Sequence, residues 1–180
     1  LVNKFGKNQG KKIGKILGMI SGWGFFICLF GLWFSPQPYY RIPFLDIKLI
    51  SLPFLHIPIY SINLIIAIPF IIISCYLGIV GVVGTSLEVS ETHQPKKIET
   101  DGLYSHMRHP QYLGAIFAHL AFSILLVGLY SLIVSPLIIL YNYLISWKEE
   151  RELIKEFGDE YIQYKKNVPM FIPKFLHPKY

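Results

Sequence analysis

Three long stretches of the chain contain no Asp, Glu, Lys or Arg: residues 16–34, 49–87 and 110–147. About 20 consecutive apolar residues are enough for a helix to cross the hydrocarbon core of a bilayer. The third stretch has 38 residues, and as one helix it would be about 57 Å long at 1.5 Å per residue. Two tilted helices joined near Gly128–Ser131 fit it better. We therefore predict four membrane spans, at residues 13–35, 59–84, 111–128 and 131–147.

The segment between the first two predicted spans, residues 36–58, contains five prolines. Proline lacks a backbone N–H and clashes with the preceding helical turn, so this segment is not one regular helix. It is apolar enough to lie at the membrane interface or to fold partly back into the protein.

The C-terminal part of the chain, residues 148–180, is polar but keeps a helical pattern of apolar positions. Such a stripe predicts an amphipathic helix that covers the membrane face or the helix ends. Gly158 is expected to break or bend this helix. The stripe consists of Leu153, Phe157, Tyr161 and Tyr164.

The pattern predicts an all-α fold, a polytopic bundle of about four transmembrane helices roofed by a cytoplasmic C-terminal helix. The whole chain, residues 1–180, forms one integral membrane domain in this interpretation. The mean hydropathy is +0.45, and charged residues make up 16% of the sequence, against about 25% in soluble domains. Composition therefore agrees with a membrane protein.

The net charge of +6 does not indicate nucleic-acid binding, because the basic residues gather beside the apolar stretches. With four spans, fifteen of the seventeen Lys and Arg residues fall on one side of the membrane. The positive-inside rule then places both termini and residues 85–109 in the cytoplasm. The first apolar stretch is about 19 residues long and no small-x-small cleavage site follows it, so we expect an uncleaved anchor.

Cysteines and histidines suggest little chemistry outside one region. Cys28 and Cys75 lie inside apolar stretches, and we interpret them as buried small hydrophobic residues. No spacing typical of a metal site or a disulfide framework is present. His56 and His119 are interpreted as structural.

Charged residues stand at both ends of the third apolar stretch. Arg108 and His109 precede it, and Glu149 and Glu150 follow it. If residues 110–147 form a hairpin, both ends return to the same membrane face and these opposite charges become neighbours. Each pair alone also has an ordinary explanation, since Arg and His snorkel to headgroups and acidic residues suit the start of a helix.

The order of motifs in this region resembles a known family. The segments "TDGLYSHMRHPQYLG" and "KEERELIKEFGDEYIQYKKNVPMFIP" are similar to the membrane methyltransferases related to isoprenylcysteine carboxyl methyltransferase, and phospholipid N-methyltransferases share the outline. The shared pattern is Gly-x-Tyr, Arg-His-Pro-x-Tyr, an apolar hairpin, Glu-Glu and Phe-Gly-x-Glu-Tyr-x-x-Tyr. It covers about residues 98–173.

The resemblance implies S-adenosylmethionine as cofactor, bound by the cytoplasmic ends of the last spans and the tail. Related enzymes commonly have a His about eight residues before the Gly-x-Tyr tyrosine. Lys96 occupies that position here, and His93 precedes it by three residues, so two candidates remain for the role. The implied cofactor-binding residues are Lys96, Gly102, Tyr104, Arg108, His109, Pro110, Tyr112, Glu149 and Glu150.

The residue types suit this cofactor. Glu149 and Glu150 can accept hydrogen bonds from a ribose diol or an ammonium group, and Arg108 can hold a carboxylate bidentately. Tyr104 and Tyr112 can face a sulfonium ion, with about 0.5–2 kcal/mol of cation–π attraction each.

We assign the catalytic roles to Arg108 and His109. A carboxylate acceptor needs no base, whereas an amine must lose a proton, for which His109 and His106 are both candidates. His109 has a structural alternative, in which it holds the loop to the helix.

The leading hypothesis is methyl transfer to a lipophilic substrate that enters laterally from the membrane at the cytoplasmic face. Carboxyl O-methylation of an isoprenylcysteine-like substrate comes first, and N-methylation of a phospholipid or lipid amine is the runner-up. A membrane oxidoreductase similar to the sterol reductases and a non-catalytic scaffold are further alternatives. The oligomeric state is left open.

Overall fold

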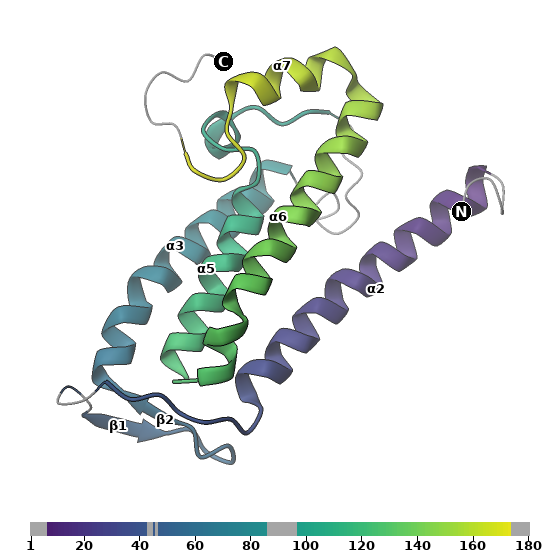
Figure 1. Cartoon of the computed structure of the whole chain (residues 1–180). Helices are drawn as coiled ribbons and strands as arrows, with labels where there is room; N and C mark the ends of the chain where they lie inside the picture. The colour runs from purple at the N-terminus through teal and green to yellow at the C-terminus, as the bar shows by residue number, and fades with distance from the viewer. Residues whose placement is uncertain (1–6, 43–44, 46, 86–96, 174–180) are drawn as a thin grey trace.

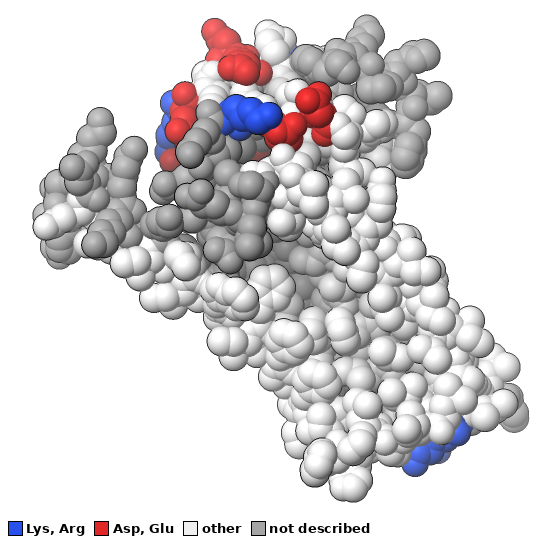
Figure 2. Space-filling view, turned by 180° about the vertical axis from the view of Figure 1, so that it is seen from behind, with Lys and Arg blue, Asp and Glu red and all other residues white. Residues whose placement is uncertain are grey.

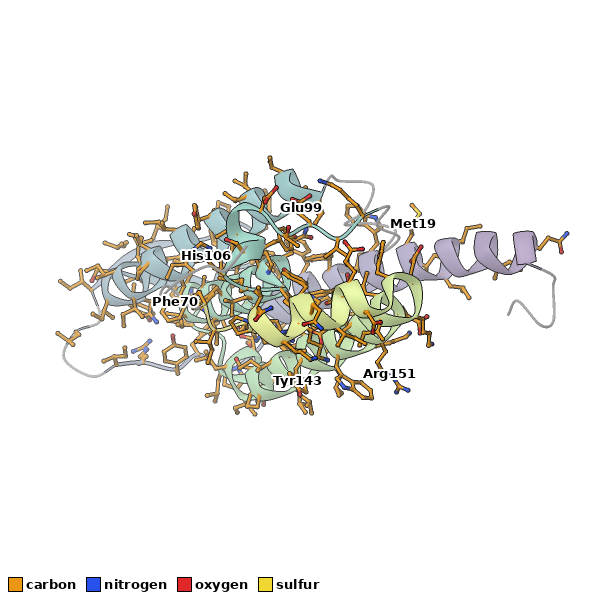
Figure 3. All side chains as sticks on the ribbon, turned by 90° about the horizontal axis from the view of Figure 1, so that it is seen from above. Met19, Phe70, Glu99, His106, Tyr143 and Arg151 are labelled. Carbon is orange, nitrogen blue, oxygen red and sulfur yellow. The ribbon has the colours of Figure 1, made fainter. Side chains whose placement is uncertain are left out.

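The computed structural model describes residues 7–42, 45, 47–85 and 97–173. The helices α3, α5 and α6 pack side by side as a bundle, whereas α2 diverges from them toward its N-terminal end (Figures 1 and 3). The elements are α2 (Lys7–Phe34), β1 (Lys48–Ser51), β2 (Pro58–Tyr60), α3 (Ser61–Thr85), the 3₁₀ turn η1 (Gly102–Ser105), α5 (Pro110–Leu125), α6 (Leu129–Phe157) and α7 (Asp159–Asn167).

The helices lie where the charge-free stretches predicted them. Ser61–Thr85 and Leu129–Phe157 are long and apolar enough to cross a membrane, and Trp23–Phe34 and Pro110–Leu125 are shorter apolar helices. In α6 the apolar part ends at Trp147, and seven of the next ten residues are charged. The apolar part of α6 is therefore residues 129–147, and the four membrane spans remain a prediction.

Small residues bring α3 and α5 into close contact. A Cβ atom on Gly114 would lie 3.1 Å from the backbone nitrogen of Gly78 and 3.2 Å from the carbonyl oxygen of Ser74. The Ser74 hydroxyl donates a hydrogen bond to the Gly114 carbonyl at 2.8 Å. Close approach of this kind is what small residues permit between helices in lipid. It places the start of α5 beside the end of α3, where the candidate site lies.

A buried polar network joins α2, α5 and α6 at the other end of the bundle. Trp33 Nε1 donates to Nδ1 of His119 at 3.2 Å. His119 Nε2 lies 3.1 Å from the Ser131 carbonyl oxygen and 3.1 Å from Ser135 Oγ. His119 is 1% exposed, so its interpretation as a structural residue is confirmed by these contacts.

The segment between α2 and α3 contains a hairpin that the all-α prediction missed. The four-residue strand β1 pairs antiparallel with the three-residue strand β2. Upstream of it, Tyr40 N donates to the Val127 carbonyl at 3.2 Å, and Leu129 N donates to the Pro38 carbonyl at 3.0 Å. Prolines excluded a helix here, as predicted, but strands this short leave almost no alternating pattern to detect.

Two further predictions concern single residues. Gly158 ends α6 with a φ of +57°, a conformation that glycine adopts without a Cβ clash, and the chain turns there into α7. The predicted break is therefore confirmed. Cys28 and Cys75 are exposed on the helix surface, so their predicted burial was wrong. Their side chains lie on the outer surfaces of α2 and α3.

The tail folds back over the end of the bundle (Figures 1 and 3). Tyr161, Tyr164 and Val168 form a buried cluster, and burial raises the pKa of both tyrosines. Tyr161 and Tyr164 of the predicted apolar stripe are therefore buried, whereas Leu153 and Phe157, at the end of α6, are partly buried against them. The partly buried residues around the cluster are Ile98, Leu153, Ile154 and Phe157.

Candidate active site

The α5–α6 hairpin brings Arg108 to Glu150. Arg108 Nε donates to Glu150 Oε1 at 2.7 Å, and His109 Nε2 lies 3.3 Å from the same oxygen. Lys165 Nζ, from α7, lies 2.7 Å from Oε2. Glu150 is 0% exposed and Arg108 is 9% exposed. The predicted convergence of opposite charges is confirmed, and three basic side chains surround one buried carboxylate.

This cluster determines the ionisation of Glu150, which lies beyond the apolar part of α6. Burial acts to raise the pKa of the carboxyl group. Hydrogen bonds from His109, Lys165 and Arg108, together with the charge on Arg108, outweigh burial and lower the pKa of Glu150 to about 2. The carboxylate is therefore ionised at neutral pH and compensated by its basic neighbours, as a buried charge requires.

Arg108 also binds the tail. Its Nη1 donates to the Lys165 carbonyl at 3.0 Å and to the Val168 carbonyl, at the C-terminal end of α7. Carbonyls there have no partner within the helix. The backbone nitrogen of Arg108 donates to Pro169 at 2.9 Å, and that of His109 donates to Met170 at 3.1 Å. One guanidinium thus joins the entrance of α5 to α6 and to the tail.

Glu149 has a different partner from Glu150. The Tyr112 hydroxyl, in the first turn of α5, donates to Glu149 Oε2 at 2.8 Å. Consecutive helical residues point about 100° apart, so the two carboxylates face different neighbours. The His109 ring lies between aromatic groups, with its centroid 5.5 Å from that of Tyr112 and 6.2 Å from that of Phe171. A half-buried carboxylate, a hydroxyl and aromatic rings therefore adjoin the charged cluster.

Tyr104 lies behind this group, against α3. Its hydroxyl donates to the Gly81 carbonyl at 3.0 Å, and Gln111 Nε2 donates to the same hydroxyl at 3.1 Å. The Tyr104 carbonyl accepts a hydrogen bond of 2.6 Å from Tyr164. Burial raises the pKa of Tyr104. The hydroxyl is thus engaged by α3, and the residue links α3 to the tail.

The other predicted site residues support the turn. Gly102 has a φ of +58°, which favours glycine at the start of η1. Pro110 occupies the first turn of α5, where its missing N–H costs nothing. His106 Nδ1 lies 2.8 Å from Ser105 Oγ and 3.2 Å from the Gly102 carbonyl. Of the two histidines considered as bases, His109 is therefore the one on the charged cluster.

The sequence-based set of site residues is undecided at Lys96 and His93 and lacks Lys165. Lys96 and His93 lie outside the described residues, so the choice between them stays open. Lys165 was missed, although its position four residues after Tyr161 puts it on the same face of a helix as the buried stripe. That spacing was the available signal.

A metal has no evident place here. Within residues 7–42, 45, 47–85 and 97–173, no group of three His, Cys, Asp or Glu side chains is positioned to hold a metal ion.

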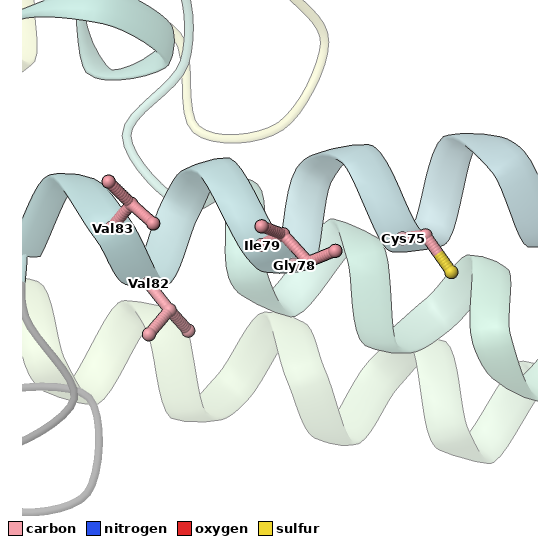
Figure 4. A pocket seen from close by; sticks show the side chains of 5 residues that line it. All are labelled: Cys75, Gly78, Ile79, Val82 and Val83. Atoms are coloured by element: carbon pink, nitrogen blue, oxygen red, sulfur yellow. The ribbon is translucent and has the colours of Figure 1, made fainter.

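An apolar depression lies on the outer surface of α3 (Figure 4). It is open and has a volume of about 410 Å³. Its end at Val83 adjoins Gly84, where an added Cβ would lie 3.0 Å from the ring of Tyr104. The depression therefore extends toward the end of α3 that contacts Tyr104. Its lining residues are Cys75, Gly78, Ile79, Val82 and Val83.

Known proteins resemble this chain over the segment that contains Arg108 and Glu150. A family model described as phospholipid methyltransferase matches residues 59–160, which is more than half of the chain. The chain belongs to the phospholipid methyltransferase family. The match begins at β2 and ends in α7, so it includes α3, η1 and both sides of the α5–α6 hairpin. This family member is accordingly a membrane protein.

Three relatives are similar to this chain over about half of its length. Methanethiol S-methyltransferase 1 of Bradyrhizobium diazoefficiens is 40% identical over 85 residues, 47% of this chain and 29% of its own length. The protein-S-isoprenylcysteine O-methyltransferases of Schizosaccharomyces pombe and Homo sapiens are each 34% identical, over 92 and 94 residues. These matches cover 47% and 48% of this chain, and 36% and 30% of the relatives. The matched part thus spans about a third of the relatives' length.

Proposed function

We propose that this protein is an S-adenosylmethionine-dependent methyltransferase that acts on a lipophilic acceptor at the cytoplasmic membrane face. The observation that carries the proposal is the juxtaposition of the Tyr112–Glu149 pair with the buried Glu150 cluster, within the segment that matches the methyltransferase family. Family membership favours methyl transfer over the reductase and scaffold alternatives considered from the sequence.

The side chains present fit this cofactor. Glu149 offers a half-buried carboxylate that can accept from a diol or an ammonium group, and Tyr112 holds it in place through a 2.8 Å hydrogen bond. The rings of His109, Tyr112 and Phe171 provide aromatic faces suited to a cation. In this arrangement Arg108 and Glu150 bind each other and the tail, so we propose that they position the pocket and that Glu149 makes the direct contact.

When bound, the cofactor supplies a methyl group on sulfonium, which is already a good leaving group. The chain's task is then to align the acceptor and to exclude water, and alignment can contribute roughly 7–11 kcal/mol. Arg108 closes the tail over η1 and α5 through the Lys165 and Val168 carbonyls. We propose that this closure keeps water out and that the acceptor enters laterally along the depression on α3, toward Val83.

The first choice of acceptor is the carboxylate of an isoprenylcysteine-like molecule. A carboxylate is nucleophilic without deprotonation, so the site needs no general base. Relatives named protein-S-isoprenylcysteine O-methyltransferase and the open apolar depression on α3 support this choice.

Two other acceptors have support from the comparisons. The relative with 40% identity carries the name methanethiol S-methyltransferase 1, which favours a thiol, and the family description favours the amine of a phospholipid. Both must lose a proton before or during transfer. We propose His109 as the proton acceptor in either case, because it is the histidine that contacts the charged cluster.

The test uses the full chain in lipid nanodiscs with methyl-labelled S-adenosylmethionine. A prenylated cysteine, methanethiol and phosphatidylethanolamine are offered separately, and alkali-labile label identifies a methyl ester. Transfer to the prenylated cysteine supports the first choice, and transfer to one of the others selects that acceptor. Absence of cofactor binding by calorimetry, with the protein folded, would overturn the proposal as a whole.

A further inference from the structure

Strand β1 of the hairpin exposes its apolar side chains. Leu49 is 53% exposed and Ile50 is 58% exposed, although Pro58 and Tyr60 of the paired strand β2 are buried. The pairing is irregular between Lys48 and Ile50, as in a β-bulge, which bends a strand and redirects its side chains. A hairpin in water normally turns its apolar side chains toward the core, so the exposed residues of β1 indicate surroundings that accept apolar groups.

The loop between the strands carries the most exposed of these side chains. Phe54 is 96% exposed and has a φ of +64°, with His56 at +52°. Such values are unusual for bulky residues. Hydrogen bonds from Leu52 N to the Ile57 carbonyl at 2.9 Å and from His56 N to the Leu52 carbonyl at 3.0 Å close the loop. The tip is thus a tightly closed loop that holds Phe54 away from the protein.

The hairpin stands at the boundary of an apolar helix. β2 ends at Tyr60 and α3 begins at Ser61, with no linker between them. Figure 1 places the hairpin at the end of the bundle opposite to α7, and Figure 2 shows basic side chains at that end, far from the charged site. The exposed apolar surface therefore continues from α3 into the hairpin.

Basic and aromatic groups at this end are of the kind that anchor proteins at a bilayer interface. The Arg41 guanidinium carbon lies 5.9 Å from the centroid of the Tyr60 ring, and Lys48 is exposed at the first position of β1. Long basic side chains can reach phosphate groups while their stems stay in apolar surroundings. Aliphatic side chains next to such groups match a lipid surface better than the surface of a soluble partner.

We propose that this hairpin is an interfacial anchor, whose tip residues Phe54 and Leu55 insert into the leaflet opposite the candidate active site. Arg41 and Lys48 lie at the level of the lipid phosphates in this arrangement. The anchor fixes the depth of α3 in the membrane, and it does not depend on the proposed enzymatic function.

Phe54→Trp provides a direct test, because the replaced side chain touches almost no protein. The variant is placed in nanodiscs with or without lipids brominated near the top of the acyl chain, and wild-type emission from the native tryptophans is subtracted. We expect bromolipid to reduce the added emission at least twofold and aqueous iodide to have little effect.

Glu156→Trp, in the exposed charged part of α6, is the matched control and is expected to show the reverse behaviour. Quenching of the Phe54→Trp emission by iodide without quenching by bromolipid would overturn the proposal. Protection from both quenchers would also overturn it, since a second copy of the chain would then cover the tip.

Discussion

Arg108 and Glu150 are 42 positions apart in the sequence, yet their side chains meet at 2.7 Å in a site that excludes solvent. The same guanidinium binds the end of α7. Three separate segments, the entrance of α5, the charged end of α6 and the tail, therefore depend on one ion pair. The Arg108 side chain is therefore engaged by Glu150 and by the backbone of the tail.

Glu150→Gln is expected to destabilise the protein by about 3–5 kcal/mol, because it leaves the Arg108 charge buried without its partner. Equilibrium unfolding in mixed micelles measures the change. Glu152→Gln is the matched control, since Glu152 forms an exposed ion pair with Lys155, and exposed pairs contribute about 1 kcal/mol or less. Equal effects of the two variants would contradict the buried-pair interpretation.

The stability of the folded protein should fall as the pH becomes acidic. The pKa of Glu150 is lowered from 4.5 to about 2 in the folded protein, so its contribution is complete above about pH 4.5 and is lost as pH falls toward 2. We expect the thermal midpoint to fall across this window. In Glu150→Gln the fall should be smaller, and an unchanged pH profile in that variant would assign the effect to other carboxylates.

Tyr112→Phe removes the hydroxyl that holds Glu149 but keeps the ring. We expect the proposed cofactor to bind about tenfold more weakly, since a hydrogen bond to a charged group contributes about 1.5–3 kcal/mol. Calorimetric titration measures the affinity. In Tyr104→Phe, whose hydroxyl donates to the Gly81 backbone, stability should fall while affinity stays within about twofold. A larger loss of affinity in Tyr104→Phe would reverse the two assignments.

Lys165→Gln tests the residue that the sequence pattern did not single out. Lys165 contacts Glu150 at 2.7 Å, and its neighbour Lys166 is exposed. We expect limited proteolysis to release the tail several times faster in Lys165→Gln than in Lys166→Gln. Identical rates would show that the Lys165 side chain does not contribute to holding the tail.

Gly78→Leu adds an apolar side chain to the depression on α3, where a Cβ would have no protein atom within 4 Å. If the depression receives the hydrocarbon part of the acceptor, KM for a prenylated cysteine should rise about tenfold, which corresponds to the burial of two or so methylene groups. KM for methanethiol and the affinity for the cofactor should not change. An equal rise of KM for both acceptors would show that the depression does not bind the hydrocarbon part of the prenylated cysteine.

Local features of the sequence determined the helical part of this protein. Charge-free stretches place α3, α5 and α6 because apolar burial and helix geometry act over about 20 neighbouring residues. Gly158 marks the break before α7 because the positive φ at this position depends on the residue type at that one position. The convergence of Arg108 with the acidic pair also followed, since a hairpin must return its two ends to one face.

Tertiary structure decided which partner each side chain takes. Adjacent carboxylates point about 100° apart on a helix, so only the packing of α5 against α6 assigns Glu150 to Arg108 and Glu149 to Tyr112. Lys165 joins the cluster because the tail folds back, and the β1–β2 hairpin forms through pairing of very short strands. Contacts of this kind depend on segments distant in the sequence, and no local pattern of apolar and polar residues encodes them.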